Sequence, residues 1–311
     1  MSIVEFLAVS PGFFVGSCLV FGLLVGSFLN VVIYRVPVML ERQWREQCAE
    51  LDADPCAMAT AVPAAAQPQA PFNLVVPRSA CPACKAPITA LQNVPVLSYL
   101  FLKGRCASCG VRISPRYPAI EALSGVLSAA VAWKFGFGWP ALAGLVLTWF
   151  LIALTFIDVD TQLLPDSLTL PLLWLGLLAS LWASDTGGRM PHPVVPQVPS
   201  EAIIGALAGY LSLWSVYHLF RLLTGKEGMG YGDFKLFAAL GAWLGWKMLL
   251  PIIVFAAAVG AVVGITIMVV RGQSRSIPIA FGPFLAAAGW LMLMFGQELV
   301  NSYWALYSPR P

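Results

Sequence analysis

Seven long apolar stretches constrain the fold of this 311-residue chain more than any other feature. A helix needs about 17–25 apolar residues to cross a bilayer, and each stretch is about that long or longer. The stretches lie near residues 13–34, 118–136, 138–157, 166–183, 202–223, 236–270 and 278–300. The run 236–270 is too long for one crossing, and Trp246-Lys247 with Pro251 marks a turn within it. With 59% hydrophobic residues and a mean hydropathy of +0.80, the sequence predicts an all-α polytopic membrane protein of about eight transmembrane helices.

The distribution of lysine and arginine predicts the orientation of these helices. When the N-terminus is placed outside, fourteen of the eighteen basic residues fall in inner loops, and the exceptions are Lys134, Arg189, Lys247 and Arg310. Cytoplasmic loops carry such an excess, so both termini are predicted to be extracytoplasmic. The first helix has no basic segment before it and is predicted to be a retained anchor. The net charge of +3 follows from insertion, and no nucleic-acid partner is predicted.

Two Cys-x-x-Cys pairs lie in the only sizeable soluble segment, residues 36–117. With 21 residues between the pairs, the four thiols are those of Cys81, Cys84, Cys106 and Cys109. This spacing is typical of a four-thiolate zinc site, and a full set of protein ligands makes the metal structural. Disulfides and a redox pair are the alternatives, disfavoured by the predicted cytosolic location and by the missing βαβ context. The Ala/Pro/Gln-rich tract 55–71 is predicted to be a flexible insertion in this zinc-ribbon-like domain.

A glycine-rich stretch between two apolar runs, Gly228 to Lys235, has the sequence Gly-Met-Gly-Tyr-Gly-Asp-Phe-Lys. Alternating glycines disfavour a helix, so a loop is predicted here. At membrane depth, non-helical backbone is tolerated only where it is buried in protein or lines a cavity. An ionisable residue in such a place indicates a functional site. The stretch therefore points to Asp233, which needs a partner.

Three acids follow the apolar run 138–157 on the same predicted side: Asp158, Asp160 and Asp166. Asp166 suits a helix N-cap, and Asp160 is expected to be more solvated. Asp158 directly follows the apolar residues and is predicted to be the deepest, and therefore the partner of Asp233. Two carboxylates at the membrane edge cannot both ionise cheaply, so one keeps a proton while the other is a base. Such a pair activates water against a peptide carbonyl.

Other interpretations stay open at this point. Asp158 and Asp233 can merely cap helices or pair with Lys226 and Lys235. Intramembrane carboxylates also suit a transporter or proton relay, and the cysteines suit a zinc-dependent scaffold without catalysis. The HExxH and GxSxG motifs of other hydrolases are absent from the sequence. Glu121, near the start of the second predicted helix, can interact with the helix dipole, pair with a neighbouring arginine or face a shared cavity.

Several motifs are distributed along most of the chain: Gly26 to Arg35, the cysteine tetrad, Asn93 to Leu100, Gly104-Arg105-Cys106, Arg116-Tyr117-Pro118 with Glu121, Asp158 to Asp166, and Gly228 to Lys235. In this combination the chain resembles the type IV prepilin peptidases, membrane aspartic proteases of the GxGD type. The resemblance implies a bifunctional enzyme. It would remove the basic leader of type IV prepilins and type II secretion pseudopilins after a glycine, and then N-methylate the new terminus with S-adenosylmethionine.

The resemblance also implies roles for particular residues at the cleavage site. Asp158 and Asp233 correspond to the two catalytic aspartates of the family. Gly230, Gly232 and Lys235 belong to the active-site loop. A prepilin resembles a single-span protein with a basic leader, so its scissile bond would lie at the inner interface beside these residues.

Methylation rests on the resemblance alone, because the glycine-rich stretch lacks the strand–turn–helix context of a Rossmann motif. Gly104, with Arg105 beside it, corresponds to a family position linked to methylation. The basic leader is expected to meet Glu121, Asp160 or Glu227.

Three domains follow from these predictions: an N-terminal transmembrane helix at 1–35, a cytoplasmic zinc-binding, methyltransferase-associated domain at 36–117, and a transmembrane aspartic peptidase domain at 118–311. The predicted location is the bacterial inner membrane, with the active site on the cytoplasmic side. The bilayer and the pilin-type substrates are the expected partners, and association into a homo-oligomer is left open.

Overall fold

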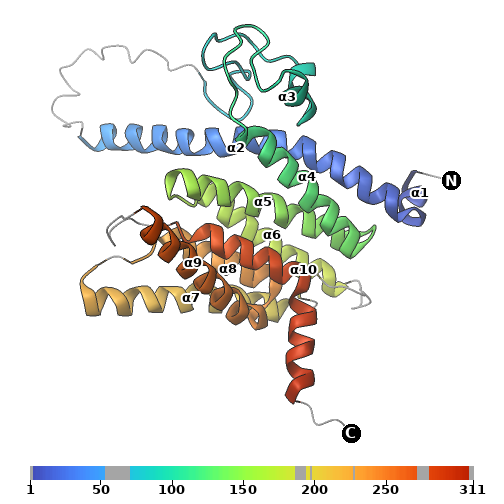
Figure 1. Ribbon diagram of the computed structural model, residues 1–311. Helices are drawn as coiled ribbons and strands as arrows, with labels where there is room; N and C mark the ends of the chain where they lie inside the picture. The colour runs from blue at the N-terminus through green and yellow to red at the C-terminus, as the bar shows by residue number, and fades with distance from the viewer. Residues whose placement is uncertain are drawn as a thin grey trace. The chain divides into compact units, whose positions relative to one another are not determined.

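The computed structural model describes residues 3–52, 71–185, 194–196, 198–226, 228–271 and 280–307. Within them the chain is helical, and its only β-pairings are two isolated bridges. The helices are α1 (Ile3–Val9), α2 (Pro11–Asp52), η1 (Leu91–Asn93), α3 (Leu97–Phe101), α4 (Arg116–Phe135), α5 (Trp139–Thr161), α6 (Asp166–Asp185), α7 (Pro199–Thr224), α8 (Tyr231–Leu244), η2 (Trp246–Met248), α9 (Leu249–Arg271) and α10 (Gly282–Tyr307) (Figure 1). The predicted all-α class is confirmed for this part of the chain.

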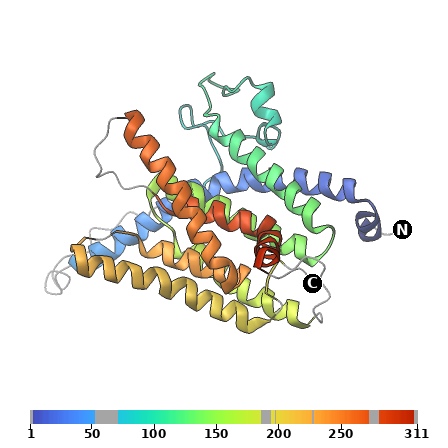
Figure 2. The same ribbon diagram turned by 60° about the horizontal axis from the view of Figure 1, so that its bottom comes forward.

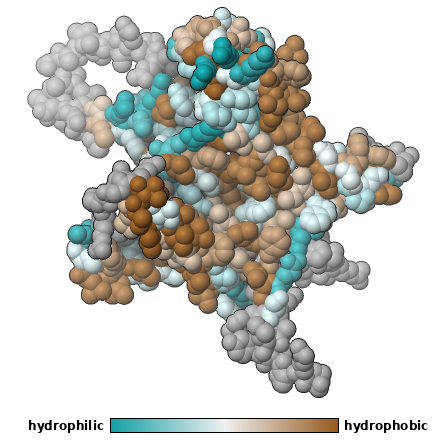
Figure 3. Space-filling model, in the orientation of Figure 1, coloured by the Kyte–Doolittle hydropathy of each residue, from teal (hydrophilic) through white to brown (hydrophobic). Residues whose placement is uncertain are grey.

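Eight long helices, α2 and α4 to α10, correspond to the eight predicted segments. Five stretches of the described residues are long and apolar enough to cross a membrane: Pro11–Glu50, Trp139–Thr161, Asp166–Ser184, Pro199–Thr224 and Trp246–Val270. The space-filling view shows hydrophobic residues over much of the visible face (Figure 3), as expected of a membrane protein. The count of eight spans is not confirmed. α8 has 14 residues and is about 21 Å long, shorter than the hydrocarbon core of about 30 Å.

The predicted turn within 236–270 is confirmed. α8 ends at Leu244, and the short 3-10 helix η2 follows before α9. Gly245 between them has a φ of 81°, a conformation that glycine adopts without steric strain. Pro251 lies in the first turn of α9, where the missing N–H group removes no bond within the helix.

The chain forms two compact units, and each is described by itself. Unit 1 contains the residues up to Gly22 and those from Ser124 onward, and unit 2 contains Leu23–Leu123. The predicted domains divide the chain at other points and stay predictions. α2 continues as one helix past Arg35 to Asp52. The predicted insertion at 55–71 lies outside the described residues except for Pro71.

Glycines bring α7 and α8 of unit 1 into backbone contact, and the two helices lie side by side in both views (Figures 1 and 2). A Cβ at Gly205 would collide with the backbone of Gly241, and a Cβ at Gly241 would collide with that of Gly205. At Gly209 a Cβ would lie 2.7 Å from the carbonyl oxygen of Phe237. Small residues permit this close approach between helices in membranes.

α8 is the most enclosed helix near the candidate site. Phe234, Phe237 and Trp243 are among its fully buried side chains. The indole N–H of Trp243 donates to the carbonyl of Leu172 on α6 at 2.8 Å. Because α6 and α7 both pack on α8, the first turn of α8 is held in a fixed position, and that turn carries Asp233.

Candidate active site and four-cysteine cluster

Asp158 lies in the last turn of α5 and is only 4% exposed. Its Oδ2 accepts a hydrogen bond from the backbone N–H of Gly282, the first residue of α10, at 3.0 Å. α5 ends just beyond it, where Gln162 adopts a left-handed conformation and its N–H bonds to the carbonyl of Asp158 at 2.9 Å. As predicted, Asp158 is buried and Asp160 is exposed.

Asp233 lies in the first turn of α8 and is 7% exposed. Its backbone N–H bonds to the carbonyl of Gly230 at 3.2 Å. The carboxylate interacts electrostatically with that of Asp158, so the two acids, 75 positions apart in the chain, come together. Oδ1 of Asp233 is buried and has no hydrogen-bond partner among the described residues. An unsatisfied buried oxygen is unfavourable and is therefore a point where water or a substrate group can bind.

The prediction that the whole stretch from Gly228 to Lys235 is a loop is wrong. α8 begins at Tyr231, so Gly232, Asp233 and Lys235 are helical. A carboxylate in the first turn interacts favourably with the helix dipole, and the helix is further stabilised by packing on α6 and α7. Together these effects outweigh the roughly 1 kcal/mol by which a glycine disfavours a helix.

The two glycines before the aspartate have different surroundings. At Gly232 a Cβ would lie 2.6 Å from Cβ of Leu164 in the connection between α5 and α6, so this position allows α8 to approach that connection. At Gly230 the nearest atom to a Cβ is Oδ2 of Asp233 at 3.9 Å. Gly232 is therefore required by packing, whereas Gly230 leaves space beside the carboxylate.

Gly282 belongs to the site, and the sequence analysis did not single it out. A Cβ there would lie 2.5 Å from Oδ2 of Asp158 and 3.1 Å from Cδ1 of Leu164. The available signal was Phe281-Gly282-Pro283 near the start of the last apolar run, because proline is favoured in the first turn of a helix. That signal predicts where a helix starts, but it does not predict that the preceding glycine donates to a distant aspartate.

Lys235 is bound by Asp166. Its Nζ lies 2.6 Å and 2.7 Å from the two carboxylate oxygens of Asp166, the first residue of α6. Both side chains are partly exposed, so the pair contributes little to stability. The pair does show that the acid engaged by this lysine is Asp166, and this observation counts against the interpretation of Asp233 as a partner of Lys235.

The three acids predicted to meet the leader differ in their surroundings. Glu121 lies on α4 in unit 2, and its Oε2 accepts a hydrogen bond from the N–H of Val96 at 2.8 Å. Asp160 is exposed, and Glu227 lies outside the described residues. Their roles as leader contacts stay predictions.

The four predicted metal ligands come together in unit 2. The sulfur atoms of Cys81, Cys84, Cys106 and Cys109 all lie within 4.8 Å of one another. Four sulfurs bound to one zinc ion at 2.3 Å would be about 3.8 Å apart, and the distance between Sγ of Cys81 and Sγ of Cys109 is 3.8 Å. The four thiols are free, and their arrangement fits a tetrahedral metal ion.

Residues 80–87 and 105–112 form two similar turns that present these thiols. In each turn the N–H of the first cysteine bonds to the carbonyl five residues later at 2.9 Å. Lys85 in one turn and Gly110 in the other have positive φ. Each turn is closed by an isolated antiparallel bridge. The spacing of the sequence motif therefore corresponds to a repeated local structure.

Backbone N–H groups in these turns favour the thiolate form of the first cysteine in each pair. Hydrogen bonds from the N–H groups of Cys84 and Ala83 lower the pKa of the Cys81 thiol to about 6. The corresponding bonds in the second turn lower the pKa of Cys106. Thiolates are the form that binds metal ions.

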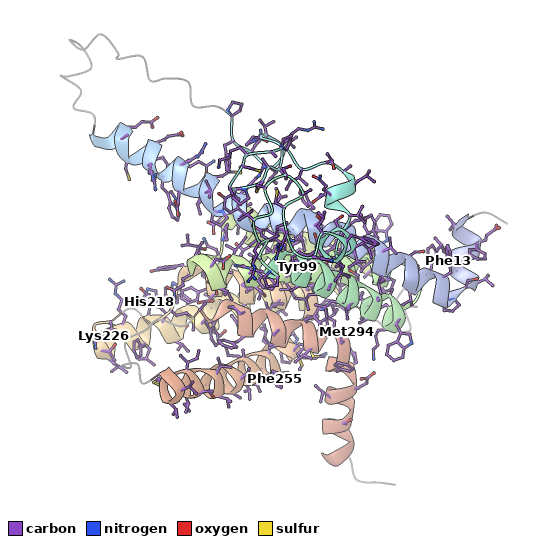
Figure 4. The ribbon with its side chains drawn as sticks, turned by 45° about the horizontal axis from the view of Figure 1, so that its top comes forward. Phe13, Tyr99, His218, Lys226, Phe255 and Met294 are labelled. Atoms are coloured by element: carbon purple, nitrogen blue, oxygen red, sulfur yellow. The ribbon has the colours of Figure 1, made fainter. Side chains whose placement is uncertain are left out.

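Gly104 and Arg105 border a hollow of about 570 Å³ on unit 2, which is also lined by Tyr99, Lys103 and Arg112. Gly104 is buried and has a φ of 67°. A Cβ there would lie 2.9 Å from the hydroxyl of Tyr99, which Figure 4 labels. Both the backbone conformation and the contact with Tyr99 therefore require glycine at this position.

The fold and the two sites define a helical membrane protein with a pair of buried aspartates at helix ends and a separate four-cysteine cluster. Two family profiles match the sequence: the Bacterial Peptidase A24 N-terminal domain over residues 20–135, and the Type IV leader peptidase family over residues 145–265. The chain therefore belongs to the type IV leader peptidase family, and the family predicted from the motifs is confirmed.

Curated relatives match along nearly the full chain, and each is named "Prepilin leader peptidase/N-methyltransferase". The protein of Aeromonas salmonicida is 51% identical over 294 residues, which is 94% of both chains. The protein of Stutzerimonas stutzeri is 50% identical over 309 residues, and that of Neisseria gonorrhoeae is 50% identical over 304 residues, each covering 97% of this chain and 98% of the relative. No solved structure matches the sequence significantly.

Proposed function

We propose that this protein is a bifunctional prepilin leader peptidase and N-methyltransferase. It removes the basic leader of type IV prepilins or pseudopilins after a glycine and methylates the new N-terminal amine. The names of the relatives and the family membership support this function. Type IV pilus biogenesis or type II secretion would use its products.

The observation that carries the peptidase activity is the pair of buried acids, with Oδ1 of Asp233 lacking a hydrogen-bond partner beside Asp158. In the proposed reaction, one carboxyl group of the pair holds a proton and the other takes a proton from water. The water oxygen bonds to the carbonyl carbon of that glycine, and the carbonyl oxygen takes the proton of the acid. When the C–N bond breaks, one hydroxyl of the diol gives its proton back to the carboxyl group that was protonated at the start. The other carboxyl group passes the proton that it took from water to the leaving amine.

The surroundings of the pair support an extended substrate segment. A helical peptide bond must unwind before water can attack it, and a glycine at the cleavage position makes unwinding easier. The open space beside Gly230 lies next to Oδ2 of Asp233 and suits a peptide backbone. Asp160, Glu121 and Glu227 are the acids proposed to meet the basic leader. Asp160 is exposed, whereas Glu121 is buried and already binds Val96.

Methylation is proposed for the part of the chain that carries Gly104 and Arg105. S-adenosylmethionine, when bound, would supply the methyl group that the new terminal amine accepts. Zinc is the metal proposed for the four cysteines, which would keep residues 80–112 folded. A segment with so small a core depends on such a link.

The proposed location is the bacterial inner membrane, with both termini periplasmic and the active site on the cytoplasmic side. The distribution of lysine and arginine supports this orientation. The five apolar helices support the membrane location.

The experiment is cleavage of a prepilin peptide by the purified full-length protein, with labelled S-adenosylmethionine present and mass spectrometry of the products. Asp158→Asn or Asp233→Asn should abolish leader removal but leave methylation of a pre-cleaved peptide. Glu201→Gln is the matched control, because this partly exposed acid pairs with Lys247 at 2.8 Å in the same unit. Substantial cleavage by either aspartate variant would refute the assignment.

A further inference from the structure

η1 and α3 of unit 2 carry large apolar side chains that the described chain leaves uncovered. Leu91 is 84% exposed and Phe101 is 83% exposed, and more than half of Leu97 and Leu100 is accessible. Soluble proteins rarely expose so many large apolar side chains in one short segment, and such a patch marks a contact with a membrane or a protein. The position of the segment relative to the apolar part of α2 distinguishes between these two.

The first indication of depth is a hydrogen bond to α2. Oγ of Ser27 donates to Oδ1 of Asn93, at the end of η1, at 3.4 Å. Ser27 lies eight residues before Arg35, where the apolar run of α2 ends. At 1.5 Å per residue, Asn93 is therefore bound to α2 about 12 Å inside the end of the apolar run.

The second indication comes from α4, which starts close to α2 in unit 2. Nδ2 of Asn30 donates to the carbonyl of Tyr117 at 3.2 Å, so these two residues lie at the same level. Glu121, four residues further along α4, binds the N–H of Val96, directly before α3. Ser27 and Glu121 are thus about 4.5 and 6 Å deeper than the Asn30–Tyr117 level. Two bonds from different helices place η1 and α3 at one depth, inside the apolar run.

The residues around this segment are basic. Between Pro71 and Tyr117 the chain has six lysine and arginine residues and no aspartate or glutamate. Three of them, Lys103, Arg105 and Arg112, follow α3 and line the hollow of about 570 Å³. Figure 3 shows hydrophobic surface directly beside hydrophilic surface at the top of the view, and the part of the chain that carries α3 lies there in Figure 1.

We propose that η1 and α3 insert into the lipid at the membrane interface, and that the basic hollow binds the phosphate groups of anionic phospholipids. Apolar residues flanked by basic ones are typical of segments that lie in the interface plane. The depth of η1 and α3 favours acyl chains over a soluble protein as the surroundings of Phe101 and its neighbours. The excess of positive charge favours anionic over neutral headgroups.

The test uses the full-length protein in nanodiscs with equal amounts of phosphatidylglycerol and phosphatidylcholine. A photoreactive p-benzoylphenylalanine replaces Phe101, and irradiation followed by intact mass spectrometry reports lipid adducts. The matched control carries the same group in place of Trp44, an exposed aromatic residue on α2 about 13 Å beyond Arg35. Lipid adducts should form at position 101 and be rare at position 44. Equal yields at the two positions would overturn the proposal.

The composition of the adducts tests the headgroup site. Phosphatidylglycerol should predominate in the adducts at position 101. In the double variant Lys103→Gln, Arg112→Gln, the preference for phosphatidylglycerol over phosphatidylcholine should fall by about fivefold for each of the two positive charges removed. Arg45→Gln, which removes an exposed charge that pairs with Glu41 on α2, should keep the preference. If the adducts of the protein that carries only the photoreactive group at position 101 reflect the bulk lipid ratio, the headgroup assignment is overturned. This readout is independent of enzymatic activity.

Discussion

Replacement of Gly282 by alanine should impair leader cleavage while the protein stays folded. The added methyl group would lie 2.5 Å from Oδ2 of Asp158, whereas an ordinary contact is at least 3.4 Å. The carboxylate or the start of α10 must therefore move by about 0.9 Å, the difference between those distances. A misplacement of about 1 Å can reduce catalysis by roughly 100-fold.

The hydrogen bond to Asp158 gives a second estimate of the same effect. A bond from Gly282 N–H to a charged acceptor contributes about 1.5–3 kcal/mol. Its complete loss corresponds to roughly 10- to 100-fold in rate. Both estimates predict a decrease in kcat of one to two orders of magnitude, because the carboxyl group of Asp158 takes part in proton transfer.

The assay measures cleavage of a prepilin peptide and methylation of a pre-cleaved peptide by the purified variant. Gly296→Ala is the matched control on the same helix, because the nearest atoms to its Cβ would be at the flexible side-chain end of Met248, with Sδ at 3.0 Å. Gly282→Ala should lose cleavage and keep methylation and a near-normal unfolding temperature. Cleavage rates equal to those of Gly296→Ala would refute the positioning of Asp158 by Gly282.

Two further predictions concern unit 2. Removal of the metal by a chelator should unfold the two cysteine turns and decrease methylation more than cleavage. Metal content and both activities are the measurements, and methylation by demonstrably metal-free protein would contradict this prediction. Gly104→Ala should destabilise the hollow by about 1–2 kcal/mol, because a left-handed conformation is unfavourable for alanine and its methyl would press on Tyr99. This variant should show decreased methylation and unchanged cleavage. Equal loss of both activities would show a general folding defect instead.

The two acids could be predicted from the sequence because each is marked by its neighbours. Asp158 follows a long apolar run, and Asp233 follows alternating glycines, so both patterns identify a carboxylate at the edge of a membrane helix. The cysteine spacing is similarly informative, because one short turn sets the geometry of each pair. In all three cases the information is local in the chain.

The residues that were missed or misplaced depend on contacts between distant segments. Gly282 is 124 positions from Asp158, and no local pattern predicts which carboxylate its N–H reaches. The helical state of Gly232 was also not predictable from its propensity, because the packing of α8 on α6 and α7 decides it. The count of eight spans is not confirmed, and the reason is related: α8 is enclosed by other helices, so its length is not set by the thickness of a bilayer.

The candidate site is formed where α5 ends and where α8 and α10 begin. Helix ends leave backbone groups without partners inside the helix, so they can bind a carboxylate or a substrate without disrupting a helix. Gly282 uses one such N–H to hold Asp158, and Gly232 allows α8 to approach Leu164, which also borders Gly282. Because each approach needs the absence of a side chain, the glycines determine how close the three ends can come. The position of the acid pair therefore depends on these glycines as much as on the aspartates.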